Sequence, residues 1–163
     1  MNLPHRKSPR LKDYDYSQNG YYFVTICSHN KQHIFSNIVG QGLAPAENKL
    51  TEYGNIAKQE LLDLENRYKI KIDKYVIMPN HIHAIIVIEG AAAGASPCPT
   101  LSDIICTFKS MVTRRCHNLS SKQKIWQTSF NDHIIRDKKD YLKIWNYIDK
   151  NPQKCGDDCF YTE

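Results

Sequence analysis

The stretch Tyr75-Val76-Ile77-Met78-Pro79-Asn80-His81-Ile82-His83-Ala84-Ile85-Ile86-Val87-Ile88 decides the fold of this chain of 163 residues. Ten of its fourteen residues are apolar, which is typical of one buried strand, or of two short strands broken at Pro79-Asn80. Alternate side chains of a strand share a face. One face is aliphatic and is expected to join the core: Ile82, Ala84, Ile86 and Ile88. His81 and His83 point together to the other face.

Two imidazoles side by side at the start of a buried strand form half of a divalent metal site, because neutral imidazole nitrogen is a common metal donor. A strand histidine is also commonly an ordinary hydrogen-bonded residue. From the pair alone, a metal-binding or catalytic role and a structural role therefore both stay open.

The bulk properties indicate one ordinary globular domain over residues 1–163. Apolar content of 41% and charged content of 24% are those of a globular protein, and no apolar run reaches the ~18 residues that a membrane span needs. The start of the chain is basic and lacks the apolar stretch of a secretory signal, so we expect a cytoplasmic protein without a membrane partner. The net charge of +5 suits solubility, and equally an anionic partner such as nucleic acid.

The remaining segments alternate between strand and helix patterns. Aromatic and β-branched residues predict the strands, apolar residues at helical spacing predict the helices, and Thr51 is a possible helix cap. We expect a strand at 20–28, a loop with Gly40, Gly42 and Pro45, a helix at 50–68, β-type residues from 69 into the histidine strand, a helix from 100 or 102 to about 116, a short strand or extended segment at 125–136, and a helix from 138 to about 151, where Pro152 stops it.

This order predicts an α+β fold: a two-layer, ferredoxin-like or RRM-like antiparallel sheet with helices on one face and the histidine pair on a strand of the sheet. An extra C-terminal helix carries a tyrosine. Residues 1–19 form a basic N-terminal segment, and the small residues at 90–99 predict a flexible linker loop. The same order suits an RNA-recognition module, so the fold alone does not decide the function.

The C-terminal helix presents Tyr147 beside its apolar stripe. On a helical wheel the apolar positions cluster on one side, and Tyr147 falls about 110° from their centre, on the flank. Asn151 lies one turn later on the same flank. A half-exposed aromatic residue and a helix-ending Asn-Pro are common features. Beside a histidine pair, however, a phenol can act as a nucleophile on phosphorus, and an amide oxygen can be a third metal ligand.

Several motifs together resemble one family. They are Met78-Pro79-Asn80-His81-Ile82-His83, Phe108-Lys109-Ser110, Ile125-Trp126-Gln127, Phe130-x-Asp132-His133-Ile134-Ile135-Arg136-Asp137 and Tyr147-Ile148-x-x-Asn151-Pro152, with Arg10-Leu11-Lys12-Asp13-Tyr14-Asp15-Tyr16 and Tyr22-Phe23-Val24-Thr25 near the start. In this combination the chain is similar to the REP-associated tyrosine transposases, which are HUH single-strand DNA endonucleases with one catalytic tyrosine. The resemblance covers nearly the whole chain outside the linker.

The resemblance implies roles for individual residues. His81 and His83 match the metal ligands, Asn151 matches the position that helps to hold the metal, and Tyr147 matches the nucleophile. The implied cofactor is a divalent metal, Mg or Mn, and the implied partner is single-stranded DNA with a hairpin, REP-like structure. The implied reaction is metal-assisted attack of Tyr147 on a phosphodiester, which leaves a 5′-phosphotyrosine and a free 3′-hydroxyl.

The predicted DNA contacts are of two kinds. Basic side chains are expected on phosphates and an aromatic one on unpaired bases: Arg10, Lys12, Lys109, Arg136 and Tyr14. A solvated basic tail and ordinary surface charges are the competing interpretations of these residues.

Two alternative functions stay open: a non-catalytic, domesticated nucleic-acid-binding module, and a nickase of the replication-initiator or relaxase kind. The resemblance leaves the oligomeric state open between a homodimer and a monomer.

Overall fold

The computed structural model describes residues 10–40, 47–90, 99–119 and 122–153. Four antiparallel strands form a sheet with the order β4-β5-β1-β6, which confirms the predicted α+β, ferredoxin-like fold. In chain order the elements are β1 (Gly20–Cys27), η1 (His29–Lys31), β2 (Ser36–Val39), β3 (Glu47–Leu50), α1 (Glu52–Arg67), β4 (Ile70–Ile77), β5 (His81–Ile88), α2 (Leu101–Leu119), β6 (Asn131–Ile135), α3 (Lys138–Lys150) and η2 (Asn151–Gln153).

The run at residues 75–88 is the hairpin between β4 and β5. It divides at Pro79-Asn80, so the second of the two sequence interpretations holds. The Met78 N–H donates to the His81 carbonyl at 2.8 Å and closes the turn. Because β5 begins directly at His81, the turn fixes which face of the sheet each following side chain occupies.

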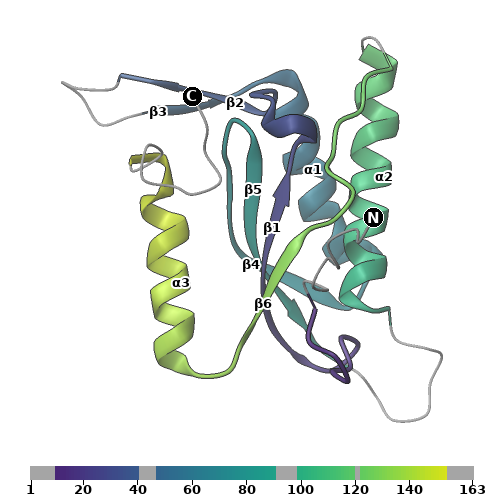
Figure 1. The fold of residues 1–163 in the computed structure, drawn as a ribbon, viewed down its shortest axis with the longest axis vertical. Helices are drawn as coiled ribbons and strands as arrows, with labels where there is room; N and C mark the ends of the chain where they lie inside the picture. The colour runs from purple at the N-terminus through teal and green to yellow at the C-terminus, as the bar shows by residue number, and fades with distance from the viewer. Residues whose placement is uncertain (1–9, 41–46, 91–98, 120–121, 154–163) are drawn as a thin grey trace, which may run out of the picture.

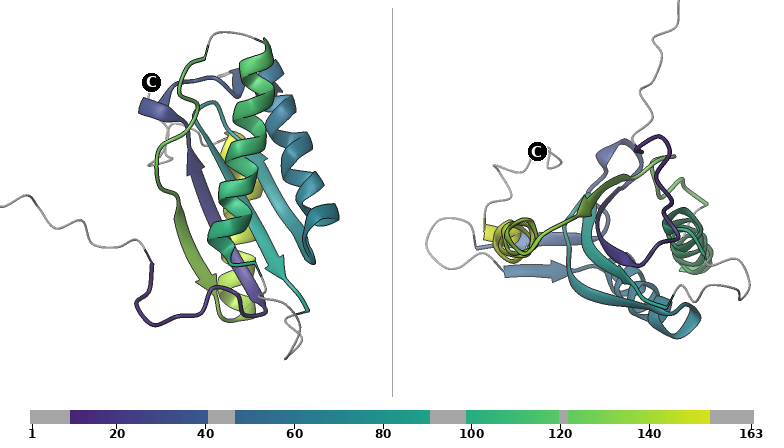
Figure 2. Two further views of the ribbon diagram at one scale, coloured as in Figure 1. Left: turned by 90° about the vertical axis from the view of Figure 1, so that its right-hand side faces the viewer. Right: turned by 90° about the horizontal axis from the view of Figure 1, so that it is seen from below.

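The sheet has helices on both faces, as Figures 1 and 2 show. The even-numbered residues of β5 belong to the larger core cluster, together with Tyr22, Val24 and Ile26 of β1. Helices α1 and α2 cover this cluster. The opposite face carries Ile85 and Val87, and α3 covers these with Ile144 and Ile148. The prediction of helices on one face is thus right for α1 and α2, while the extra C-terminal helix adds a third layer.

Helix α1 begins where the sequence suggested. The Thr51 side chain accepts a hydrogen bond from the Gly54 N–H at 3.1 Å, so Thr51 is the N-cap, while Leu50 is still the last residue of β3. A Cβ atom on Gly54 would lie 1.9 Å from the Phe35 carbonyl oxygen. Glycine therefore lets the first turn of α1 pack directly on the chain that enters β2.

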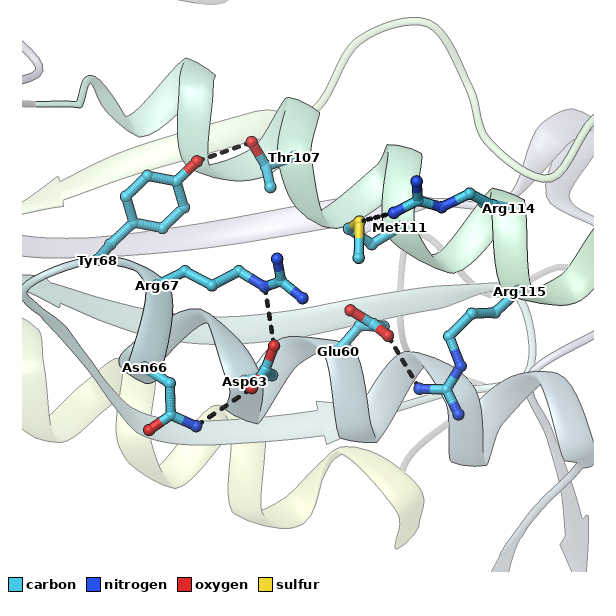
Figure 3. A network of polar contacts seen from close by, with 9 residues as sticks. All are labelled: Glu60, Asp63, Asn66, Arg67, Tyr68, Thr107, Met111, Arg114 and Arg115. Carbon is cyan, nitrogen blue, oxygen red and sulfur yellow. Dashed lines mark hydrogen bonds and ion pairs between the residues drawn. The ribbon is translucent and has the colours of Figure 1, made fainter.

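Polar contacts join α1 to α2 in Figure 3. The Tyr68 hydroxyl, just after α1, and the Thr107 hydroxyl of α2 lie 2.8 Å apart. Arg115 of α2 donates to the Glu60 carboxylate at 2.9 Å, and Glu60 is buried. The two helices are therefore held together by hydrogen bonds as well as by the apolar residues beneath them.

The predicted loop after the first strand was incomplete, because the structure forms a second, two-stranded sheet there from β2 and β3. Both strands have four residues and a largely polar composition, Ser36-Asn37-Ile38-Val39 and Glu47-Asn48-Lys49-Leu50, so they lack the apolar pattern that predicts a strand. The Asn48 amide donates to the Ile77 carbonyl at 2.7 Å, which attaches this hairpin to the end of β4.

The other boundaries agree with the sequence within a few residues. Helix α2 runs on to Leu119, and the segment predicted at 125–136 contains β6 after a bridge between Ser28 and Trp126. Most of the predicted linker, 91–98, and residues 1–9 of the basic segment lie outside the described residues. No helix among the described residues combines the length and apolar character that crossing a membrane requires.

Candidate functional site

The two histidines lie together on the sheet face that α3 covers. His81 and His83 are both fully buried, and their ring centroids are 4.5 Å apart. They occupy alternate positions of β5, directly after the turn, so the strand geometry aims both rings to the same side. The spacing that the sequence suggested thus produces a real pair of neighbouring imidazoles.

A neighbouring strand orients His83. Thr25 of β1 lies opposite His83 in the antiparallel ladder, and its Oγ1 is 2.9 Å from His83 Nδ1. When Nδ1 donates its hydrogen to this hydroxyl, Nε2 keeps its lone pair and is the available ligand atom. The contact with Thr25 is thus compatible with the form of His83 that would bind a metal through Nε2.

The turn orients His81 in the same way. Its Nδ1 lies 2.7 Å from Oδ1 of the preceding residue, Asn80, which is also fully buried. Since a carbonyl oxygen only accepts, Nδ1 must carry the hydrogen and Nε2 the lone pair. Both histidines therefore have an oxygen partner on Nδ1, the arrangement common among metal-ligating histidines.

Tyr147 reaches the pair from α3. Its hydroxyl is 3.3 Å from His83 Nε2, and its ring contacts Phe23 at 6.2 Å between centroids in an edge-on arrangement. Ile144 and Ile148 point into the sheet, which leaves Tyr147 on the flank of the helix with 39% of its surface exposed. The structure agrees with the helical wheel in placing Tyr147 on the flank of α3, where its hydroxyl also lies close to the imidazole.

Asn151 follows one turn later, at the end of α3. Its backbone N–H bonds to the Ile148 carbonyl and its φ and ψ are helical, so the residue continues the helix into η2. Only 3% of its surface is exposed. The chain therefore turns Asn151 inward on a helix whose Tyr147 contacts His83.

The residues present fit a divalent cation. Among the described residues, no cluster of three or more His, Cys, Asp or Glu side chains is placed to hold a metal, so a cation at this site would have the two imidazoles as its nitrogen ligands. A third protein donor must then be an oxygen of another kind, and the buried amide of Asn151 is of the right chemistry. So few protein ligands suit Mg or Mn, which keep positions for water and for substrate phosphate oxygens.

The predicted DNA-contacting residues fall into different environments. Arg10 lies over the Phe130 ring, hydrogen-bonds to Ser102 and stands 3.9 Å from an Asp132 carboxylate oxygen. Tyr14 is half-buried and its hydroxyl lies 3.3 Å from that of Tyr22. Both residues thus have structural contacts, and their predicted roles on DNA stay predictions.

The other three basic residues differ from one another. Lys109 donates to the carbonyls of Gln127 and Ser129, each at 2.9 Å, and burial lowers its pKa. It lies on α2, which packs on the sheet face opposite the histidines, so it holds the chain before β6 rather than joining the tyrosine site. Lys12 and Arg136 are exposed, and Arg136 lies between β6 and α3, at the base of the tyrosine helix.

Thr25, Phe23 and Asn80 lie within motifs that resemble the family, but the sequence alone suggested no role for them. Thr25 and Phe23 come from a strand nearly sixty positions earlier in the chain, and only the register of β1 against β5 brings them to His83. Asn80 was visible as the neighbour of His81. Its buried carbonyl oxygen could have been anticipated as a partner for the ring.

Comparisons with known proteins agree with this fold. A Haemophilus influenzae protein of uncharacterised function is 35% identical over 177 residues, covering 99% of this chain and 96% of that protein. A REP-associated tyrosine transposase of Escherichia coli K12 is 22% identical over 141 residues, covering 86% of this chain and 71% of that protein. The solved structure of a REP-associated tyrosine transposase bound to a REP hairpin matches with a TM-score of 0.66 and 22% identity, over 90% of this chain and 74% of that one. No protein-family model matches the chain.

The chain is thus similar, in sequence and in fold, to REP-associated tyrosine transposases.

Proposed function

We propose that the protein is a metal-dependent endonuclease and strand transferase for single-stranded DNA, with Tyr147 as its nucleophile. The observation that carries the proposal is the 3.3 Å contact between the Tyr147 hydroxyl and His83 Nε2. This contact supports Tyr147 as the attacking group, because it puts the phenol beside the atoms that would hold an ion against a phosphate.

The residues that would hold a divalent ion, Mg or Mn, are His81 and His83 through Nε2 and Asn151 through its amide oxygen. Such an ion polarises a phosphate oxygen and stabilises the charge that develops on it. Thr25 and Asn80 would keep the two rings oriented for this task throughout the reaction.

In the proposed reaction, the Tyr147 oxygen attacks the phosphorus in line with the bond to the 3′ oxygen. The tyrosine–phosphorus bond forms, the bond to the 3′ oxygen breaks, and the 3′ oxygen ends with the proton that the phenol gives up. The products are a 5′-phosphotyrosine and a free 3′-hydroxyl. A 3′-hydroxyl that then attacks the phosphotyrosine joins two strands and releases Tyr147. The phosphotyrosine bond thus keeps the energy of the cleaved phosphodiester until the strands are joined.

The proposed substrate is single-stranded DNA that folds into a hairpin. A structurally similar transposase has been solved bound to a REP hairpin, which supports this substrate class. The exposure of Tyr147 is also compatible with a macromolecular substrate, because a side chain that attacks a small-molecule substrate normally lies in an enclosed pocket.

A denaturing gel tests the proposal. The purified chain is incubated with end-labelled single-stranded hairpin repeats from beside its own gene, in Mn, Mg or EDTA. We expect a slow-migrating covalent band with either metal, and none in EDTA or with Tyr147→Phe. Tyr53→Phe is the matched control, since it removes a phenol oxygen from α1, on the other side of the sheet, and should leave the band unchanged.

Each failure has a definite meaning. A band that survives Tyr147→Phe overturns the assignment of the nucleophile. Hairpin binding without any band contradicts the enzymatic proposal and favours a binding module, whereas a band without strand joining favours a nickase.

A further inference from the structure

A basic hollow opens at the junction of β6 and α3, away from the histidines. Its volume is about 700 Å³, and it lies between the end of β6, the first turns of α3 and the N-terminal segment. We call it the β6–α3 groove, and its basic lining residues are Arg10, His133, Arg136, Lys139 and Lys143.

The acidic residues of the groove already have partners. Asp140 lies 2.7 Å from His133 Nε2, and Asp132 lies 3.9 Å from Arg10. Asp137 caps α3 and accepts the Asp140 N–H at 2.8 Å. The groove therefore has three carboxylates against four permanent cations, Arg10, Arg136, Lys139 and Lys143.

The remaining cations are not matched. Arg136, Lys139 and Lys143 are exposed, and none of them makes an ion pair with any residue in the ranges that the structure describes. The groove consequently carries a surplus of positive charge, which attracts a polyanion.

The surplus charge leads toward the nucleophile. Lys139, Lys143 and Tyr147 follow one another at intervals of four residues, so they lie along one side of α3. At about 1.5 Å per residue, Lys139 and Tyr147 are about 12 Å apart along the helix axis. A few nucleotides of single-stranded DNA span this distance.

An aromatic hollow of about 320 Å³ adjoins the groove and shares Arg136 with it. Tyr21 and Tyr141 lie in this hollow with ring centroids 5.8 Å apart, and 43% of Tyr21 is exposed. Tyr141 is fixed by a hydrogen bond from its hydroxyl to Asp73. Tyr21, partly exposed, packed edge-on against the fixed Tyr141 ring and beside the Arg136 guanidinium, is a suitable platform for an unpaired base.

We propose that the β6–α3 groove and the Tyr21 hollow bind the unpaired strand that leads to the scissile phosphate, with Lys139 and Lys143 on phosphates and Tyr21 stacked on a base. This inference rests on the proposed function for the meaning of the scissile phosphate. The site itself is a site for single-stranded DNA whether or not cleavage follows.

The test measures binding alone, in EDTA, with the full chain. A short fluorescein-labelled oligothymidylate is titrated at several salt concentrations and followed by fluorescence anisotropy. Lys139→Gln/Lys143→Gln should weaken binding and flatten the salt dependence by about 0.7 in the logarithmic slope for each lost phosphate contact. Tyr21→Leu should weaken binding about fivefold or more without changing the slope, because stacking carries no counterions.

The control is Lys58→Gln/Lys69→Gln, which removes the same charge from exposed positions in and directly after α1. It should keep the wild-type slope. The proposal is wrong if the groove variant Lys139→Gln/Lys143→Gln behaves like this control. It is also wrong if the groove variant loses as much affinity for labelled polyglutamate as for the DNA, because the groove would then attract any polyanion. If the groove variants lose DNA but no covalent band ever forms with hairpins, the groove stands and only the proposed function fails.

Discussion

At the scale of single residues, the site depends on which nitrogen of His83 carries a hydrogen. Thr25 Oγ1 and Tyr147 Oη lie on opposite sides of the ring, at 2.9 Å from Nδ1 and 3.3 Å from Nε2. A hydrogen on Nδ1 satisfies the threonine and leaves Nε2 available. The hydroxyl on β1 thus influences what the imidazole can bind on its other side.

Replacing Thr25 by valine should lower the affinity for Mn by about 10–100-fold, because the ring loses the partner that fixes its tautomer and orientation. Isothermal titration with Mn measures the affinity directly. Thr25→Ser, which keeps the hydroxyl, should recover most of it. Equal affinities for the valine and serine variants would show that the hydroxyl has no such role.

Asp132 should give the protein a distinctive pH dependence. Burial raises the pKa of its carboxyl above the ordinary value of 3.8, and this outweighs the lowering by Tyr16 and Arg10. The native state therefore holds this proton more tightly than the unfolded state, so the contribution of Asp132 is favourable below 3.8 and is lost as the pH rises through the native pKa. Asp132→Asn removes this loss.

The melting temperatures of the wild type and Asp132→Asn should accordingly diverge in favour of the variant as the pH rises from 3.8 toward neutrality. Thermal unfolding followed by circular dichroism over this range makes the comparison. A constant difference between the two proteins would contradict the assignment.

The sequence predicted the histidine pair, the tyrosine and the asparagine, because strand and helix periodicity relate neighbours along the chain. It did not reveal the role of Thr25, because the partner of Thr25, His83, lies far away in sequence. Lys109 shows the same limit: its type suggested a phosphate contact, while the fold places two carbonyls within reach of its ammonium group.

At the scale of elements, α1 and α2 share an ion pair whose carboxylate, that of Glu60, is buried while the arginine, Arg115, is partly exposed. Glu60 is 7% exposed and Arg115 is its partner across the helix interface. Arg115→Ala leaves a buried carboxylate with one partner fewer and should lower the free energy of unfolding by about 1–3 kcal/mol. Urea denaturation measures this change.

The matched control is Arg67→Ala, in the same pair of helices but at an exposed ion pair with Asp63. Its cost should be about 0.3–0.5 kcal/mol. Equal costs for the two arginines would mean that burial of Glu60 adds nothing to the pair.

The longer elements were predictable from apolar periodicity, and the short β2–β3 hairpin was not. Its strands are attached through the main chain: the Phe35 carbonyl accepts the Thr51 N–H at 3.0 Å, and Asn48 bonds to the Ile77 carbonyl. Such attachments depend on tertiary position and leave little trace in composition.

At the scale of the whole molecule, the two faces of the sheet have cores of unequal size. The face under α1 and α2 carries most of the buried apolar residues, while α3 rests on the small cluster of Ile85, Val87, Ile135, Ile144 and Ile148. Polar contacts supplement it, including the ion pair of Lys74 with Asp149 at 2.6 Å. The helix that carries Tyr147, the proposed nucleophile, is therefore the most weakly anchored layer.

Hydrogen exchange should reveal this order. Amides of α3 should exchange through local opening well before those of β1 and β5, which lie at the centre of the sheet. Mass spectrometry of peptides covering 138–150, 20–27 and 81–88 makes the comparison. Simultaneous exchange of all three segments would show that α3 unfolds only with the whole domain.

The three-residue connection Met78-Pro79-Asn80 is anchored on several sides. The Pro79 carbonyl accepts the N–H groups of Ile34 and Phe35, and the Asn80 carbonyl accepts that of Ser28. Insertion of one residue here would keep every residue of β5 but would exchange the faces of the sheet that its side chains occupy. The imidazoles would then enter the aliphatic core, and Ile82 would lie near Tyr147. The site therefore depends on the length of this connection as well as on its own residues. A descendant with one inserted residue would separate the imidazoles from Tyr147 while keeping every proposed site residue.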